Sequence, residues 1–417
     1  MNYTGIFENI LDLGAAMIKC GGEVRRVEIA VDILAKSYGF SKCNFFVIPA
    51  YINGTVTSPD GETITQIREI GISSADYGRL DKLNALSRRI AADKPDAAVF
   101  SDELAEIMRE EKQSTLFKYI ASAIGVAGFS VFFGCDLMDV LVAILVSFAG
   151  TFLLDHFSGR EQNPLMKNFV ISLVLEFLIL LMVHLGIGHH SGYITIGVVM
   201  QLISGLATTN GIHDLVHLDT VSGISNIILS ATGAIGIALG MAVPIYFLHS
   251  WGSGELFPAA ISPAVTLIGT AGACFGFSLC YGIRGKKLIT CTVGGVLTAG
   301  VYVIASGIIS NSFIANLVAS IFTGIYAQVM VRIEKAPSTL FNTFGVFPLI
   351  PGSSLYYLMY GLIIQDSGMA TSSTIGLLNA SFGIVLGLMV VESVVKYMAG
   401  SRKILENKIK QRRAGQK

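Results

Sequence analysis

Apolar residues form long stretches through most of this chain, whereas polar residues gather near its two ends. From Leu116 onward, ten apolar segments each approach the roughly 20 residues that a helix needs to cross a bilayer. The pattern predicts a polytopic α-helical membrane protein. The approximate limits of the ten spans are 116–134, 137–155, 168–186, 193–211, 223–248, 260–281, 287–308, 313–333, 343–364 and 374–398.

Residues 1–113 have a different periodicity and predict a soluble α/β domain. Their first apolar residues recur at helical spacing as far as Gly21 and Gly22, which should end that helix. We then expect a helix at 23–38, strands at 44–49, 51–57 and 62–70, and helices at 76–92 and 102–112.

The stretch 342–366 is apolar enough to cross a membrane, yet Pro348 and Pro351 interrupt it. Backbone groups freed by such a break are tolerated in hydrocarbon only if they are buried in protein or face a watery cavity. A matching stretch lies 147 residues earlier: the ungapped pairing of 202–243 with 349–390 has 12 identities in 42 positions. We interpret this as an internal duplication. The identical pairs include Gly205/Gly352, Asp219/Asp366, Gly236/Gly383 and Gly240/Gly387.

The predicted spans repeat with the same period, because adding 147 to the limits of the first five comes close to the second five. An odd number of spans turns the second copy upside down. The halves, 114–255 and 256–400, are therefore expected to be inverted repeats, followed by a basic tail at 401–417. Secondary transporters commonly have this arrangement, with the substrate near the midplane on broken helices.

Lysine and arginine in the short loops predict the orientation. With the N-terminal domain in the cytoplasm, the loops on the opposite side (187–192, 249–259, 309–312 and 365–373) contain neither residue. Both termini are therefore expected in the cytoplasm. The loops on the cytoplasmic side contain Arg160, Lys167, Arg284, Lys286 and Lys335.

Composition supports a membrane protein, since 14% of the 417 residues are charged, against roughly 25% in soluble domains. The formal net charge is zero and gives no indication of a nucleic-acid partner. Six cysteines lack metal or redox spacing and are expected to be free thiols. No phosphate-binding loop, nucleophile elbow or metal motif is visible. We therefore expect no enzyme, no cofactor and no cleavable signal peptide.

Two carboxylates fall inside predicted spans. Glu176 lies mid-span, where a charge is costly unless it is paired or faces water, so a role in proton coupling is the favoured hypothesis. A protonated glutamic acid that bonds a neighbouring helix is the alternative. Glu392 lies within a turn of Lys396 near the cytoplasmic end, so coupling there competes with snorkelling or an ion pair.

A polar run follows the first interrupted element and contains Asn210, His213, Asp214, His217 and Asp219. Histidine titrates near neutrality, so His213 with Asp214 and Asp219 could relay protons at the inner mouth. A loop that merely contains polar residues is the alternative. Two histidines four residues apart are a weak signal for zinc, and no metal is predicted.

The strongest candidates for substrate contact follow the second break: Pro351, Gly352, Ser353 and Ser354. A helix that restarts there would present free amides and its positive dipole end to a carboxylate. The alternative is that proline and glycine only kink the span. The matching half-site would contain Gly205, Thr208, Thr209 and Asn210.

Charged residues also open the second helix of the N-terminal domain: Glu23, Arg25, Arg26 and Glu28. Salt bridges between exposed helix residues explain them as well as a regulatory ligand does.

Three motifs in order resemble the threonine/serine exporter family over nearly the whole chain. They are GGEVRRVE at 21–28 with FVIP at 46–49, GLATTNGIHDL at 205–215 with DTVSG at 219–223, and LIPGS at 349–353. The resemblance implies a ten-span carrier of the cell (inner) membrane that expels small metabolites using the proton gradient. The two modules also occur as separate chains in a two-component exporter associated with succinate. Ser204 and His213 depart from the proline and the arginine expected of the family, and the latter bears on the charge of the substrate.

The sequence thus predicts a proton-coupled antiporter that exports small carboxylate-bearing metabolites, threonine and serine first. A dicarboxylate such as succinate is the alternative substrate. A ligand-gated channel or a membrane receptor with a cytoplasmic sensing domain is the alternative of another class. The expected partners are a small-molecule substrate, protons and membrane lipid, and a homo-oligomer is left open.

Overall fold

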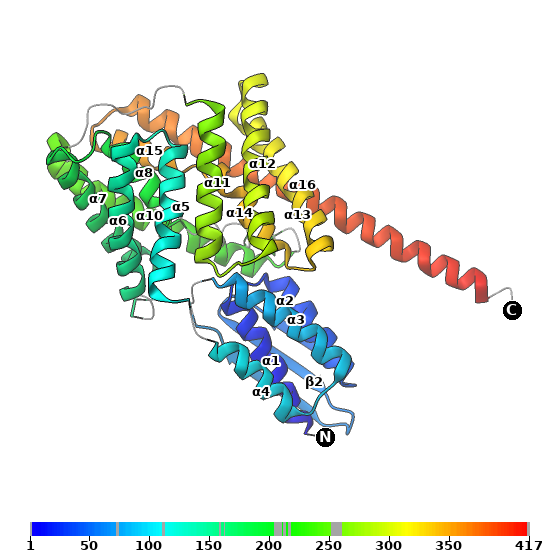
Figure 1. Cartoon of the computed structure of the whole chain (residues 1–417). Helices are drawn as coiled ribbons and strands as arrows, with labels where there is room; N and C mark the ends of the chain where they lie inside the picture. The colour runs from blue at the N-terminus through cyan, green and yellow to red at the C-terminus, as the bar shows by residue number, and fades with distance from the viewer. Residues whose placement is uncertain are drawn as a thin grey trace.

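The computed structural model shows a bundle of long helices above a smaller N-terminal unit (Figure 1). The structure describes residues 2–71, 75–110, 113–157, 160–161, 163–203, 211, 214–215, 218–251 and 261–414, with the backbone alone for His249 and residues 399–414. Helices of this length and apolarity make the chain a multi-pass membrane protein.

Residues 3–109 form four helices and one small antiparallel sheet with strand order β1-β2-β3. The three predicted strands are confirmed. The helix expected at 102–112 begins earlier, at Ala97, because the Asp96 carboxylate accepts a hydrogen bond from Val99 N and caps it there. That this unit folds by itself remains a prediction. The elements are α1 (Tyr3–Lys19), α2 (Val24–Ser37), β1 (Ser41–Val47), β2 (Tyr51–Thr57), β3 (Thr63–Glu69), α3 (Tyr77–Asp93) and α4 (Ala97–Arg109).

Eight helices of the described residues are long and apolar enough to cross a membrane. They are α5 (Thr115–Phe132), α6 (Leu137–Phe157), α7 (Pro164–His184), α10 (Thr220–Leu248), α11 (Pro263–Cys280), α12 (Lys286–Ile308), α13 (Ser312–Glu334) and α16 (Ser367–Ala414). A ninth candidate is the pair 338–349 and 352–363, bent by 45° at the predicted break.

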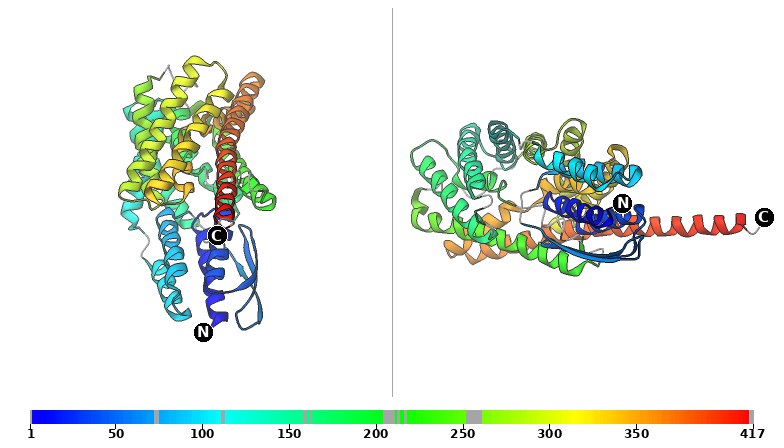
Figure 2. Two further views of the ribbon diagram at one scale, coloured as in Figure 1. Left: turned by 90° about the vertical axis from the view of Figure 1, so that its right-hand side faces the viewer. Right: turned by 90° about the horizontal axis from the view of Figure 1, so that it is seen from below.

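The fourth predicted span and the C-terminal tail differ from the other segments in how far the structure describes them. Of the span expected at 193–211, the structure describes α8 (Ser191–Val199) and the chain as far as residue 203, so the count of ten stays a prediction. The basic tail expected at 401–417 stays a prediction, and as far as residue 414 its backbone continues the last helix. No proline interrupts it, and α16 runs on to Ala414, projecting far from the body (Figure 2).

The internal duplication has a direct counterpart in two short helices. α8 and α14 (Ser338–Val346) each have 9 residues, start with serine and end with valine, and lie 147 residues apart. Every residue of both helices is buried. Each helix leads into one of the two predicted breaks.

The turn before the last span of each half also recurs. Asp219 N donates a hydrogen bond to Asp214 O (3.0 Å), and 147 residues later Asp366 N donates to Gly361 O (2.9 Å). The residue before each aspartate has a positive φ, which is uncommon for a residue with a side chain. These two residues are Leu218 (+67°) and Gln365 (+61°).

Small residues bring the third and fifth spans of each half together in the same register. A Cβ on Gly240 of α10 would lie 2.3 Å from Phe169 O of α7. A Cβ on Gly387 of α16 would lie 2.7 Å from Leu317 O of α13. The duplicated sequence therefore forms the same helix pair twice.

The two halves cross along α5 and α11. A Cβ on Gly128 would lie 2.1 Å from Ala273 N, and one on Gly276 would lie 2.2 Å from Gly125 N. Position 276 lies 148 residues after position 128, and 273 lies 148 residues after 125, one residue more than the offset of 147 found later in the repeats. The glycine of one half thus contacts the backbone of the other half, and the reverse contact also exists, as a two-fold axis between the halves requires. That this axis lies in the membrane plane, which would make the repeats inverted, remains a prediction.

We expect Gly128→Ala to destabilise the protein by about 1–3 kcal/mol, because a methyl group cannot enter this backbone contact without separating two helices. Gly307→Ala in α12 is the matched control. No atom lies within 4 Å of a Cβ there, so alanine should be neutral or stabilising by up to about 1 kcal/mol. Thermal unfolding in detergent measures both variants, and equal midpoints would contradict the close crossing.

Candidate functional site

A cavity of about 350 Å³ lies between the two halves at the predicted breaks. The first break contributes Gln201, Leu202 and Ile203 to its wall, and the second contributes Ile350, Pro351 and Gly352. The two interrupted elements, far apart in sequence, therefore face one space. Other lining residues include Lys167 and Asn168 of α7, Ser230 and Gly233 of α10, and Leu377 of α16.

The second break restarts as a helix, α15 (Gly352–Ile363), which begins at the cavity wall. Pro351 occupies its N-cap, and no side chain among the described residues caps it. The amide of Gly352 donates to Ile350 O at 2.8 Å. The amides of Ser353 and Ser354 follow in the first turn, where the helix itself supplies no acceptor, so these two are the donors left for an anion. Ser354 lies against Gly376 of α16, where a Cβ would be 3.1 Å from its Oγ. Pro351 and Gly352 line the cavity, and of the predicted quartet these two are the best placed.

The predicted half-site of the first break falls on residues whose structure is not described. Gly205, Thr208, Thr209 and Asn210 lie outside the described residues, as does His213. Their contribution to the cavity stays a prediction.

Sequence reasoning missed several polar residues of the cavity wall, among them Lys167 and Gln201. Lys167 entered only as a loop charge for orientation, yet it lies in the first turn of α7 and lines the cavity. Gln201 lies next to the first break, and its Nε2 is buried without a partner among the described residues. The available signal was that Lys167 and Gln201 are polar residues near the ends of apolar segments. Polar residues at such positions usually lie at the membrane surface, so the signal did not indicate a cavity.

Glu176 is buried in α7, with 1% of its surface exposed. It accepts a hydrogen bond from Thr195 Oγ1 of α8 at 2.8 Å, and its Oε1 has no partner among the described residues. Tyr356 of α15 lies within electrostatic reach of it. The mid-span carboxylate thus lies where an interrupted element of each half meets α7.

A second group of carboxylates lies on the side of the N-terminal unit. Asp214 is fully buried and accepts a hydrogen bond from Asn226 Nδ2 at 3.1 Å. Burial, followed by the nearby charge of Glu23, raises the pKa of Asp214 to about 7. Glu392 of α16 is half-buried and lies within electrostatic reach of both. The structure therefore brings together two of the predicted coupling residues and adds Glu23.

For Glu23, the interpretation as an exposed helix residue, one of the two alternatives, is wrong. Only 3% of its surface is exposed, because its carboxylate accepts hydrogen bonds from Ser338 and Thr339 of α14. The expected helical salt bridge does exist between Arg25 and Glu28, at 2.6 Å.

Asp219 lies in the recurring turn before α10, and its counterpart Asp366 indicates what that position does. Asp366 Oδ1 accepts a hydrogen bond from Met369 N at 3.0 Å and so caps the start of α16. A capping role is therefore an alternative to proton transfer for Asp219, whose coupling role stays a prediction.

Asp136, Asp139 and His189 form a further cluster on the opposite side, with ligand atoms within 4.8 Å of one another. These atoms could hold a metal ion, but they also hydrogen-bond one another and the backbone. Asp136 Oδ2 lies 2.5 Å from His189 Nδ1, and this hydrogen bond raises the pKa of the histidine.

Comparison with known proteins gives a consistent result. A family model described as "Putative threonine/serine exporter" matches residues 8–248, and one described as "Threonine/Serine exporter, ThrE" matches residues 266–394. A relative from Mycobacterium tuberculosis (strain ATCC 25618 / H37Rv), described as "Probable threonine/serine exporter", is 21% identical over 423 residues. That alignment covers 95% of this chain and 78% of the relative. No solved structure matches the chain.

Asp214→Asn tests the buried carboxylate. Asp214 ionises near pH 7 when folded but near pH 4 when unfolded, so wild-type stability falls as the pH rises from about 4 to 7. The variant removes this penalty. Its advantage in stability should grow by about 2 kcal/mol between pH 5 and pH 8. Melting temperatures across this range provide the measurement, with Asp60→Asn in an exposed turn as the control. A pH-independent difference would show that Asp214 is not buried as described.

Proposed function

The chain belongs to the threonine/serine exporter family, and from that premise we propose that it exports threonine or serine in exchange for protons. Membership makes it an exporter of a small molecule. The substrate, the coupling ion and the direction across the cell membrane are the proposal.

The observation that carries the proposal is the cavity at the meeting of the two breaks. Gly352 begins α15 at its wall and Lys167 lies across it on α7. A carboxylate would accept hydrogen bonds from the amides of Ser353 and Ser354 in the first turn of α15, and the ammonium of Lys167 would balance its charge. Gln201 and Asn168 line the same cavity, so their side-chain amides would be available to the hydroxyl of the substrate.

The charge of this wall favours threonine over succinate. Lys167 is the one charged side chain among the described lining residues. Lys167 can pair with one carboxylate, whereas the second carboxylate of succinate would meet no cation among the described lining residues. The ammonium of threonine needs acceptors instead, and the side-chain amide oxygens of Gln201 and Asn168 in the wall can accept.

Proton coupling is assigned to Glu176, with Asp214 and Glu392 as proton acceptors on the predicted cytoplasmic side. Glu176 contacts α8 of the first half and lies beside α15 of the second. Gain or loss of one proton there changes the charge at the point where the halves meet. Movement of one half against the other would then open the cavity to one side at a time.

Lys167→Met should reduce threonine export from proteoliposomes at least tenfold, because a carboxylate in the cavity would lose its counter-ion. Lys167→Arg should retain most of the activity. Arg160→Met removes a basic residue from the same loop region outside the cavity and should export normally. Wild-type export of succinate at the rate of threonine, or unimpaired export by Lys167→Met, would contradict this substrate site.

Glu176→Gln should abolish the stimulation of export by an imposed pH gradient, because glutamine carries no titratable proton. Exchange of threonine for threonine without a gradient needs no net proton transfer and should stay within about twofold of wild type. Gradient-driven export that survives in the variant would remove Glu176 from the coupling mechanism. Wild-type flux that ignores the gradient would favour a channel.

A further inference from the structure

The N-terminal unit is attached to the membrane bundle through α14, the short helix that leads into the second break. Glu23 accepts hydrogen bonds from Thr339 Oγ1 (2.7 Å) and Ser338 Oγ (3.1 Å) in the first turn of α14. A buried carboxylate is costly unless it is well paired, and the positive end of a helix dipole stabilises it. The contact is therefore a specific anchor on the start of this helix.

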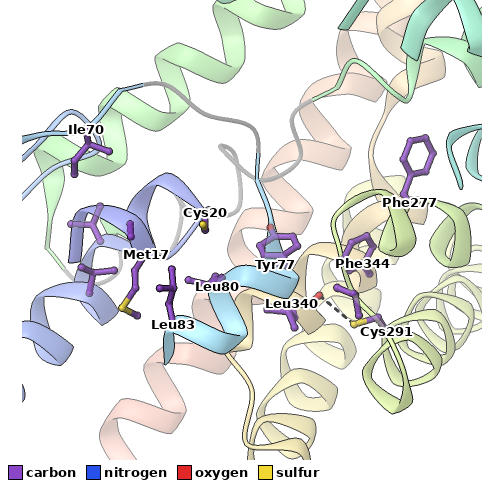
Figure 3. Close-up of a cluster of buried hydrophobic side chains, with 14 of the residues drawn as sticks. Met17, Cys20, Ile70, Tyr77, Leu80, Leu83, Phe277, Cys291, Leu340 and Phe344 are labelled. Carbon is purple, nitrogen blue, oxygen red and sulfur yellow. Dashed lines mark hydrogen bonds between the residues drawn. The ribbon is translucent and has the colours of Figure 1, made fainter. Parts of the chain in front are cut away.

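Tyr77 forms a second contact one turn further along α14. It is fully buried, and its hydroxyl lies 2.9 Å from Thr343 Oγ1. Its ring packs edge-on against Phe344 at 6.0 Å, and its backbone N donates to Tyr281 O at 2.8 Å. Figure 3 shows this ring between Leu80 of the N-terminal unit and Phe344 of the bundle, within one continuous apolar core.

The first half anchors its own short helix in the same way. Asp139 of α6 is fully buried and lies at the start of α8. Its Oδ1 accepts hydrogen bonds from the backbone N of His189 (2.7 Å) and His190 (3.1 Å), and its Oδ2 lies 2.7 Å from His190 Nδ1. Both short helices, 147 residues apart, therefore begin at a buried carboxylate.

The second half does not supply this carboxylate from the corresponding helix. α12 takes the place of α6, yet it begins with Lys286 and Lys287 and has no acidic residue in its first turn. Lys287 instead pairs with Asp81 of the N-terminal unit. The N-terminal unit thus provides the carboxylate that α12 lacks, Glu23. It also provides Asp81, which pairs with the lysine at the start of α12.

We propose that the N-terminal unit is the inner gate of the exporter, with Glu23 as the positioning residue that holds α14 and the second break. Asp139 and His190 form the matching outer anchor on α8. The inference rests on the proposed exporter function, because a gate has meaning only for a cavity that opens to both sides. Asp214 and Glu392 lie within electrostatic reach of Glu23, so ionisation of either residue adds a like charge that opposes the closed state. In each transport cycle the unit must move away from α14.

A bridge between the unit and α12 tests this requirement. Asp81→Cys with Lys287→Cys replaces a half-buried ion pair, and a short bis-maleimide can join the two thiols. The bridged protein should export threonine at least tenfold more slowly than the same variant before bridging. Each single variant treated with the reagent controls for reaction at native cysteines. Full-rate export by the bridged protein would overturn the proposal. Absence of threonine export from wild type would instead contradict the proposed function.

Glu23→Ala provides a second test, in which a local change in amide hydrogen exchange distinguishes loss of the anchor from a general loss of stability. Amide hydrogen exchange should become at least fivefold faster in residues 338–346 and remain unchanged in 191–199. Asp139→Asn should have the opposite distribution. Glu28→Ala, on the same helix as the anchor but paired with Arg25, should change neither segment. Equal exchange in 338–346 for Glu23→Ala and wild type would remove Glu23 as the anchor.

Discussion

A helix that is interrupted inside a membrane has backbone donors and acceptors that lipid cannot satisfy, and this constraint governs the architecture. The described residues contain one such interruption, after α14, and α8 ends shortly before the point where the sequence predicts the other. Both α8 and α14 are buried along their whole length. Burial keeps these segments away from lipid, and residues 201–203 and 350–352 line one cavity.

The remaining helices hold these two elements in place. Glycine at Gly240 and Gly387 lets the last span of each half contact the backbone of the third. Glycine on α5 and α11 does the same where the halves cross. Close packing of this kind replaces the hydrophobic effect, which does not drive association between helices in lipid. Each half thus has a closely packed pair of long helices and one short helix, α8 or α14, whose start is bound by a buried carboxylate.

Much of this could be predicted from the sequence. The strands of the N-terminal unit, eight of the spans and the break at Pro351 lie where periodicity and proline placed them. These signals are local, since they depend on neighbouring residues along one element. Lys167 and Gln201 were not predicted as cavity residues, and the burial of Glu23 was not predicted. Their surroundings are made by segments tens to hundreds of residues away, which no local pattern describes.

By itself, the sequence determined that the chain crosses the membrane many times and is duplicated. The length of each apolar segment matches the thickness of a bilayer, and the 147-residue repeat can be read directly from the order of the residues. The tertiary structure alone decided which polar residues meet. It paired Glu23 with α14 and Asp139 with the start of α8. The physical reason is that a carboxylate becomes an anchor only when folding removes water from it and supplies its hydrogen-bond donors from another part of the chain.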